Sequence, residues 1–99
     1  MSFEYIAKVD EPSHRIRRAT ALNLVNVSAT VRQDFFLDKL YPVYLQLSID
    51  SAWGVRKAAV ECLPDISKLC PMKVRATELV ELFLKFAKDG NKWVKVAAL

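Results

Sequence analysis

The stretch DSAWGVRKAAVECL, residues 50–63, joins an acidic turn to a helical segment with small residues near its centre. A shortened copy of it, DGNKWVKVAAL, occupies residues 89–99. Shifting the chain by 39 residues, the interval from Val55 to Val94, superimposes the two copies. The same interval leads back from Val55 to Ile16, so a third copy begins earlier in the chain. A repeat of this length is typical of solenoid proteins, in which each unit is one supersecondary element.

Apolar residues at three- and four-residue spacing predict helices along the whole chain, and no long stretch alternates with a period of two. We expect helices near residues 3–8 and 16–27, and a third that Asp34 or Asp38 opens and that ends before the turn at 49–52. Further helices are expected near 53–69, around 79–86 in the segment that Pro71 starts, and from 92 onward. The predicted buried stripes are Ile16, Ala19, Asn23, Leu24 and Val27; Leu40, Val43, Tyr44 and Leu47; Val55, Ala58, Ala59, Cys62, Ile66 and Leu69; and Leu79, Leu82, Phe83 and Phe86.

Turn-forming and helix-breaking residues complete this prediction. Ser13 can cap the second helix, or Pro12 can occupy its first turn. Pro42 and Pro64 should each bend the helix that contains them, because proline removes a backbone hydrogen bond. Asp89, Gly90 and Asn91 form the strongest turn signal in the chain.

The fold class that follows is all-α: a solenoid of antiparallel helix pairs, with about two and a half repeats. We divide the single array, 1–99, into a partial repeat at 1–30, a repeat at 34–70 and a partial repeat at 72–99. Solenoids end in polar capping repeats, and neither end of this sequence is polar enough for that role. We therefore expect the chain to be a fragment of a longer solenoid.

Composition narrows the class of protein. The chain has 99 residues, 53% of them hydrophobic, and only two glycines, which favours buried helices over disorder. No apolar run approaches the length of a membrane span, and the N-terminus lacks the pattern of a signal peptide. Cys62 and Cys70 are too far apart along a helix to form a disulfide, so we expect reduced core thiols. The expected location is the cytoplasm, with the nucleus left open as a second compartment.

Pro42, Asp50, Val55 and Arg56 follow the pattern of a known repeat. In HEAT repeats a proline of the first helix is followed eight residues later by a turn aspartate, five residues after that by valine, and then by Arg or Lys. The chain thus resembles a HEAT/ARM-type superhelix. The adjoining copies keep the pattern without its proline. In the later copy Glu81 replaces the proline and is followed by Asp89, Val94 and Lys95. In the earlier copy Phe3 replaces it and is followed by Glu11, Ile16 and Arg17.

One stretch also resembles a particular HEAT family. WGVRKAAVECL, followed one repeat later by WVKVAAL, looks like the arrays of the protein phosphatase 4 regulatory subunit 1 family, relatives of the protein phosphatase 2A scaffold. The resemblance implies a non-catalytic scaffold that binds a PP2A-like Ser/Thr phosphatase catalytic subunit. In the scaffold family the turns inside the repeats grip the enzyme. Carried over, the partner-binding residues are Asp50, Ser51, Ala52 and Trp53, with Gly90, Asn91, Lys92 and Trp93.

The acidic and basic residues of the repeat have a structural interpretation as well. In HEAT arrays they resemble a ladder, in which the turn carboxylate of one repeat bonds the Arg or Lys of its neighbour. Such bonds would hold neighbouring repeats at a set angle, and this interpretation is preferred to binding. The ladder residues would be Glu11, Asp50 and Asp89 with Arg17, Arg56 and Lys95.

Trp53 and Trp93 differ by one place in the 39-residue register, so they do not occupy one shared core position. Each ring either packs half-buried on the adjacent repeat or anchors a partner, since tryptophan is enriched at interface hot spots.

The remaining polar residues do not indicate an enzyme. His14 has no nearby second ligand, and Ser, Asp and His are too scattered for a triad, so we expect no catalytic residue, metal, cofactor or small-molecule substrate. The net charge is +4, with Arg15, Arg17 and Arg18 clustered. Helix periodicity points these arginines in different directions, which favours a solvated face over a nucleic-acid site. The alternative function is a nuclear-transport or chromosome-associated HEAT adaptor that binds cargo or nucleic acid.

Overall fold

Residues 13–98 are described by the computed structural model, and every regular element over that range is helical. In each helix pair a first helix is followed by a second one. The second helices are α2 (His14–Ser28), α5 (Trp53–Leu69) and α8 (Lys92–Ala98). Two first helices are each built from three consecutive segments. They are α3 (Gln33–Phe35), η2 (Phe36–Leu40) and α4 (Tyr41–Ser48), and then α6 (Met72–Val74), η3 (Arg75–Leu79) and α7 (Val80–Ala87).

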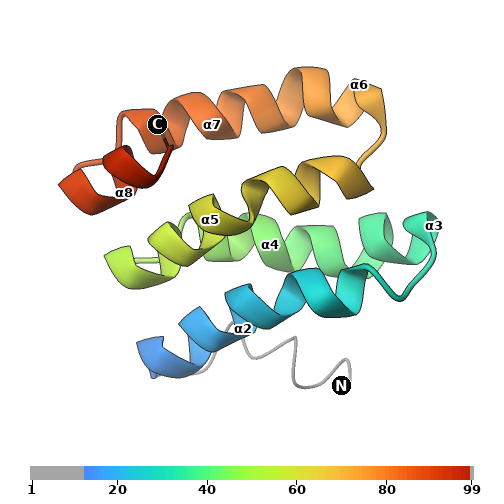
Figure 1. Ribbon diagram of the computed structural model, residues 1–99, viewed down its shortest axis with the longest axis horizontal. Coiled ribbons are helices and arrows are strands. Elements are labelled where there is room, and N and C mark those ends of the chain that lie inside the picture. The colour runs from blue at the N-terminus through green and yellow to red at the C-terminus, as the bar shows by residue number, and fades with distance from the viewer. Residues whose placement is uncertain (1–12, 99) are drawn as a thin grey trace.

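The helix pairs stack in chain order, from α2 at one edge to α7 and α8 at the other (Figure 1). The central helix α5 packs against α2, α4 and α8, and α7 packs against α8. Each pair thus buries one side against its neighbour, which a single pair cannot do alone. The fold is an all-α solenoid, as the sequence predicts.

The π-helical turns of the two first helices recur with the period of the sequence. The first composite helix has a π-helical turn at Phe36–Leu40, and the second has one at Arg75–Leu79, an interval of 39 residues. Pro42 follows the first of these turns, where its missing N–H falls in the first turn of α4. Glu81 stands in its place in the second copy, so proline is not required for the irregular turn. Pro64 lies inside α5 without ending that helix.

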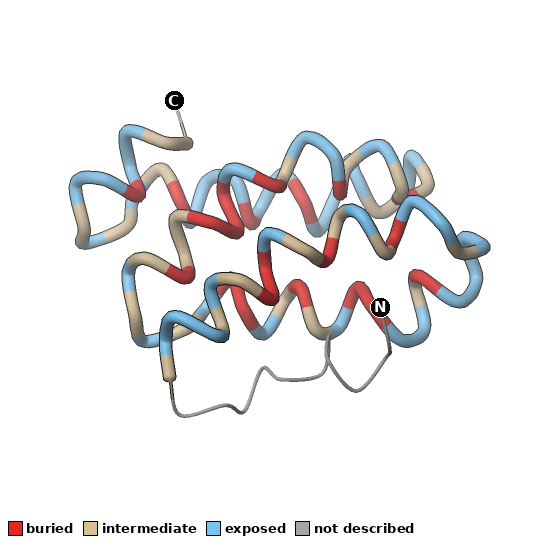
Figure 2. The backbone as a smooth tube through the Cα atoms, turned by 60° about the horizontal axis from the view of Figure 1, so that its bottom comes forward, coloured by how far each residue is buried: buried red, intermediate tan, exposed pale blue. Residues whose placement is uncertain are grey.

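Beside a smaller cluster, the core between the helices is one large apolar cluster, and buried positions recur along each helix (Figure 2). Tyr44 is fully buried in it, and its hydroxyl donates a hydrogen bond to the carbonyl oxygen of Ala59 at 2.7 Å. Close approach of α5 to α2 is visible at Cys62, whose Sγ lies 3.5 Å from the carbonyl oxygen of Ala21. Small side chains at the contact, including the buried Ala58, permit this approach. The predicted stripes of α4 and α5 therefore face the core.

Two predicted core residues are exposed instead. Ile16 has 37% of its surface accessible, whereas its register equivalents Val55 and Val94 are fully buried. Val55 lies in one cluster with Leu47 of the first helix of its own pair, whereas a first helix paired with α2 would fall outside the described residues. Phe83 is also exposed, on the side of α7 that borders a groove described below.

The start of α2 differs from the prediction too. Ser13 occupies the N-cap position, but its side chain makes no capping hydrogen bond. The expected helix at 3–8, together with Glu11 and Pro12, lies outside the described residues.

Both cysteines are free and buried. Burial, reinforced by the nearby carboxylates of Asp65 and Glu61, raises the pKa of the Cys62 thiol to about 11. Burial likewise raises the pKa of Cys70. The two thiols are therefore protonated at neutral pH and act as small apolar side chains. Over the same described range, no helix combines the length and the apolar character that crossing a bilayer requires.

Candidate partner-binding surface

Two turns of matching design join the first helix of a pair to the second. In one, Oδ1 of Asp50 accepts a hydrogen bond from the backbone N–H of Ala52 at 2.9 Å. In the other, Oδ1 of Asp89 accepts from the N–H of Asn91 at 2.8 Å. Aspartate favours such turns because its short side chain bonds the backbone two residues ahead. These backbone hydrogen bonds help to orient the turn carboxylates.

Arginines of the second helices hold these carboxylates. Arg17 donates from Nε to Oδ2 of Asp50 at 2.7 Å and from Nη2 to Oδ1 at 3.1 Å. Arg56 donates to Asp89 in the same way, at 2.8 and 3.0 Å. Both pairs span 33 positions and join the second helix of one pair to the turn of the next. Paired parallel bonds of this kind are strong and directional, so they orient neighbouring repeats.

Arg56 also links one rung to the other. Its Nη1 donates to the backbone carbonyl oxygens of Asp50, at 2.8 Å, and of Ser51, at 3.2 Å. The result is a continuous polar chain, which runs from Arg17 through the first turn and Arg56 to Asp89. Glu11, the first predicted member of the ladder, lies outside the described residues. Lys95 is exposed at the far end, and its charge favours the ionised form of Asp89.

The ladder lowers the pKa of both carboxyl groups. Burial alone would raise the pKa of Asp50, but the hydrogen bonds from Arg17 and Ala52 and the charges of Arg17 and Arg56 outweigh it. For Asp89 the hydrogen bond from Arg56 is the largest influence, opposed by burial and aided by the N–H of Asn91. Both groups are therefore ionised at neutral pH, and their oxygens are occupied by the fold.

The other predicted partner-binding residues follow these turns. Asn91 uses its side-chain oxygen to cap α8, accepting from the N–H groups of Trp93 at 2.9 Å and Val94 at 3.4 Å. Lys92 places its ammonium group 5.0 Å from the centre of the Trp93 ring. Ser51 is exposed in the first turn. We call the residues Asp50–Trp53 and Gly90–Trp93 the turn ridge.

The two tryptophans of the turn ridge share one surface feature. Trp53 and Trp93 are 46% and 52% exposed, and both line a groove of about 560 Å³ at the start of the second helices. We call this feature the basic groove, because its lining also includes His14, Arg15, Arg18 and Lys57.

Sequence reasoning missed the convergence of these side chains. Arg17 turns away into the ladder, as different helical directions predict, but Arg15 and Arg18 reach the same groove. Their three-residue spacing was the available signal, since residues three apart share one face of a helix. Arg15 and Arg18 are both exposed, as a solvated face implies, but they do not point in different directions, since both line this groove. His14 is exposed, as expected, and lines the same groove.

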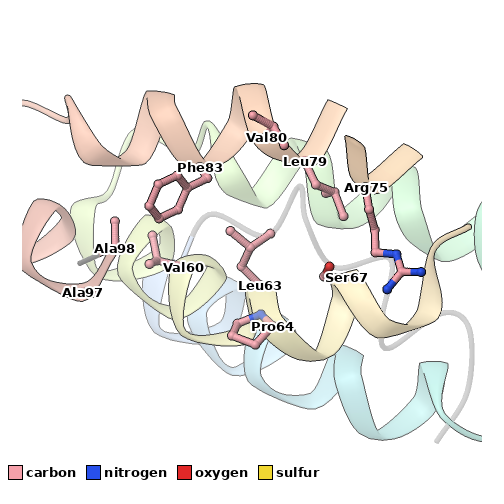
Figure 3. Close-up of a pocket in the computed structure, with 10 residues that line it drawn as sticks. All are labelled: Val60, Leu63, Pro64, Ser67, Arg75, Leu79, Val80, Phe83, Ala97 and Ala98. Carbon is pink, nitrogen blue, oxygen red and sulfur yellow. The ribbon is translucent and has the colours of Figure 1, made fainter. Parts of the chain in front are cut away.

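A second groove of about 340 Å³ is apolar. It lies between α5, the η3–α7 helix and the end of α8 (Figure 3). Leu63, Val80 and Phe83 supply much of its wall, and Arg75 is the only charged side chain that lines it in the described part of the chain. The exposed position of Phe83 is explained by this opening.

The accessible side chains of the basic groove suit the binding of another molecule. Over residues 13–98 no group of three or more His, Cys, Asp or Glu side chains is placed to hold a metal ion. The thiols are buried and protonated, and the turn carboxylates are held by arginines. In the basic groove the accessible side chains are mainly cationic and aromatic, a combination that recognises anionic or apolar groups on another molecule.

Comparisons with known proteins agree with the repeat pattern. Residues 40–70 match the family model described as HEAT repeat. The chain is 41% identical over 49 residues to the serine/threonine-protein phosphatase 4 regulatory subunit 1 of human, mouse and rat. That match covers 50% of this chain and 5% of each relative's length. No solved structure matches the chain with significance. Residues 40–70 therefore match a HEAT repeat, the described residues form an all-α solenoid, and half of the chain resembles in sequence a phosphatase regulatory subunit.

Proposed function

We propose that the protein is a non-catalytic scaffold or regulatory subunit that binds the catalytic subunit of a PP2A-like Ser/Thr phosphatase. The observation that carries this proposal is the 41% identity to phosphatase 4 regulatory subunits over half of the chain. The regular row of turns supports it, because the ladder gives the partner a surface whose spacing is set by the fold.

Within this proposal the turn ridge contacts the enzyme. Trp53 and Trp93 project from successive second helices and are half exposed, which suits ring burial against another protein. Asp50 and Asn91 have structural duties in the ladder and in the cap of α8. Their contribution to binding is therefore to hold the ridge in shape, while the tryptophans and Lys92 make the contacts.

The scaffold acts mechanically and not chemically. Bonds between turns resist rotation of one repeat against the next, whereas the apolar core permits small slides of packed helices. A bound catalytic subunit would be held in one orientation along this row. The protein itself would turn over no substrate.

A co-precipitation experiment tests the proposal. The tagged protein is mixed with a purified PP2A-like catalytic subunit, and the retained enzyme is quantified for W53A/W93A and for the unsubstituted chain. We expect the double variant to retain about tenfold less enzyme, since aromatic anchors dominate interface energetics. The matched control is F35A/M72A, which removes two exposed apolar side chains from α3 and α6. These elements lie at the end of the array opposite the starts of α5 and α8 (Figure 1).

Equal retention by W53A/W93A and the control would contradict the assignment of the ridge. A labelled DNA duplex, titrated at two salt concentrations, examines the adaptor alternative. Tight binding with a steep dependence on salt would favour that alternative over the scaffold.

A further inference from the structure

The basic groove combines two kinds of side chain that recognise different parts of one ligand. Arg15 and Arg18 come from α2, Lys57 comes from α5, and the tryptophan rings come from the starts of α5 and α8. The groove thus crosses three successive second helices. Its volume, about 560 Å³, lies in the range of sites that hold a small molecule or a few residues of a peptide.

The charges in this groove are available to a ligand. Among residues 13–98, neither Arg15 nor Arg18 forms an ion pair, in contrast to Arg17, which is held by Asp50. Lys57 pairs with Glu61 at 3.3 Å, and the two side chains are 35% and 47% exposed, so this pair contributes little and leaves the ammonium group accessible. No acidic residue of the described range lines the groove.

Arg18 is also positioned by its neighbour across the helix contact. A side-chain carbon placed on Gly54 would lie 3.9 Å from Cδ of Arg18, so the arginine stem lies along the first turn of α5. Arg18 and Trp53 line the same groove, so a cationic and an aromatic side chain border one space.

We propose that the basic groove binds a short acidic peptide segment that also carries apolar side chains. Its carboxylates contact Arg15, Arg18 and Lys57, and its apolar side chains pack on Trp53 and Trp93. Charge complementarity selects this occupant, since guanidinium groups bind carboxylates with two parallel bonds and exposed tryptophans bind apolar groups.

A nucleic acid fits this groove less well. Binding of single strands requires a cationic track along several phosphates as well as stacking platforms. The groove offers three cationic side chains besides His14, and Glu61 lies next to one of them. A peptide with a few carboxylates satisfies all three without extending beyond the groove.

This inference deepens the proposed function, because the two tryptophans also belong to the turn ridge. It names the chemistry of the partner segment, which is acidic and apolar. Its test uses no phosphatase, so either idea can fail without the other.

The experiment exploits the tryptophan content of the chain, which is two residues, both in the groove. A short peptide of Glu and Leu residues is titrated into the 99-residue protein while tryptophan emission and acrylamide quenching are recorded. The same peptide with Gln in place of Glu is the neutral control. We expect the Glu peptide to shift the emission to the blue and to protect the rings, and the Gln peptide to bind about tenfold more weakly or worse.

Two double variants locate the charges. R15Q/R18Q should weaken binding of the Glu peptide about tenfold, as two charge-assisted contacts are lost. R32Q/K39Q removes the same net charge from two exposed side chains outside the groove, and it should bind as the unsubstituted chain does. Circular dichroism of all variants verifies that each is folded.

The proposal is overturned if R15Q/R18Q and R32Q/K39Q lose affinity equally, or if the Gln peptide binds as well as the Glu peptide. It is also overturned if fluorescence anisotropy shows that a labelled Glu peptide binds while tryptophan emission does not change. The peptide would then bind outside the basic groove. Tighter binding of oligo-dT than of the Glu peptide at one ionic strength would assign the groove to nucleic acid instead.

Discussion

Arg56 donates to both carboxylate oxygens of Asp89, at 2.8 and 3.0 Å, while its other terminal nitrogen donates to the backbone of the preceding turn. One side chain therefore ties two consecutive turns together. Arg17 and Asp50 repeat the carboxylate half of this arrangement one unit earlier. Because the bonds recur with the sequence period, they constrain the relation between repeats and not merely the shape of one turn.

Breaking one rung should destabilise the array. Asp50→Asn keeps an oxygen that can accept from Ala52 but removes the charge that holds Arg17. The side chains of Arg17 and Asp50 are only 14% and 9% exposed, so we expect a loss of about 1–2 kcal/mol in the free energy of unfolding. Asp50→Ala should lose more, since the turn bond disappears as well. Urea unfolding, followed by circular dichroism, measures both changes.

The control for this prediction is Asp34→Asn. Asp34 pairs with Arg32 at 3.5 Å, and both side chains are almost fully exposed. Its substitution should change stability by less than about 0.5 kcal/mol. Equal effects of Asp50→Asn and Asp34→Asn would show that the ladder contributes no more than an ordinary surface pair.

Acid should weaken the array through the same carboxylates. In the folded chain the pKa of Asp50 and that of Asp89 lie below the ordinary value of 3.8. Such groups contribute their full stability above the unfolded pKa, and this contribution is lost as the pH falls through the lower, folded pKa. We therefore expect the free energy of unfolding to decline steeply below pH 3.8, measured by urea unfolding across a pH series.

D50N/D89N isolates the two groups from the other carboxylates. The variant should be less stable than the unsubstituted chain at neutral pH, and the difference should shrink as the pH falls below 3.8. A difference that stays constant across the series would mean that neither carboxylate is held in its ionised form by the fold.

A charge in the apolar core should unfold the chain. Val55 is fully buried in a cluster with Ala21, Leu47 and Ala58, so Val55→Asp leaves an unpaired carboxylate among apolar side chains. The expected cost is about 3 kcal/mol or more. Val96→Asp is the control, because Val96 is largely exposed on α8. A thermal melting curve that Val55→Asp leaves unchanged would contradict the buried position.

The thiols should resist modification until the chain unfolds. Cys62 and Cys70 are buried, and burial raises the pKa of both, with Cys62 at about 11. At neutral pH we expect iodoacetamide to label neither residue in buffer and both in urea, as read by mass spectrometry. Rapid labelling of Cys62 in buffer would show that α5 separates readily from α2.

Much of the fold follows from local chemistry and from the period. The helix at Trp53–Leu69 begins and ends where the apolar spacing and the adjoining turns predict. Burial of Leu40, Tyr44 and Leu47 is likewise a matter of which side of a helix each residue occupies. These features depend on neighbours three or four positions away, so the sequence contains the information directly.

The three- and four-residue spacing could not decide whether Ile16 and Phe83 are buried or exposed. Both lie on apolar stripes, yet both are exposed, because exposure depends on whether another helix covers the stripe. The π-helical turns at Phe36–Leu40 and Arg75–Leu79 also lack a distinct sequence signal, since only one of them is followed by a proline.

The basic groove also separates what the sequence determines from what tertiary packing determines. Sequence alone determined the 39-residue period, the helical class and the turn carboxylates, because spacing and side-chain type act locally along the chain. Only the tertiary structure decided that Arg15 and Arg18 meet Trp53 and Trp93, since these residues belong to three different helices. These side chains line one groove because the packed helices have a particular rotation and offset. Contacts between residues far apart in the sequence set that rotation and offset.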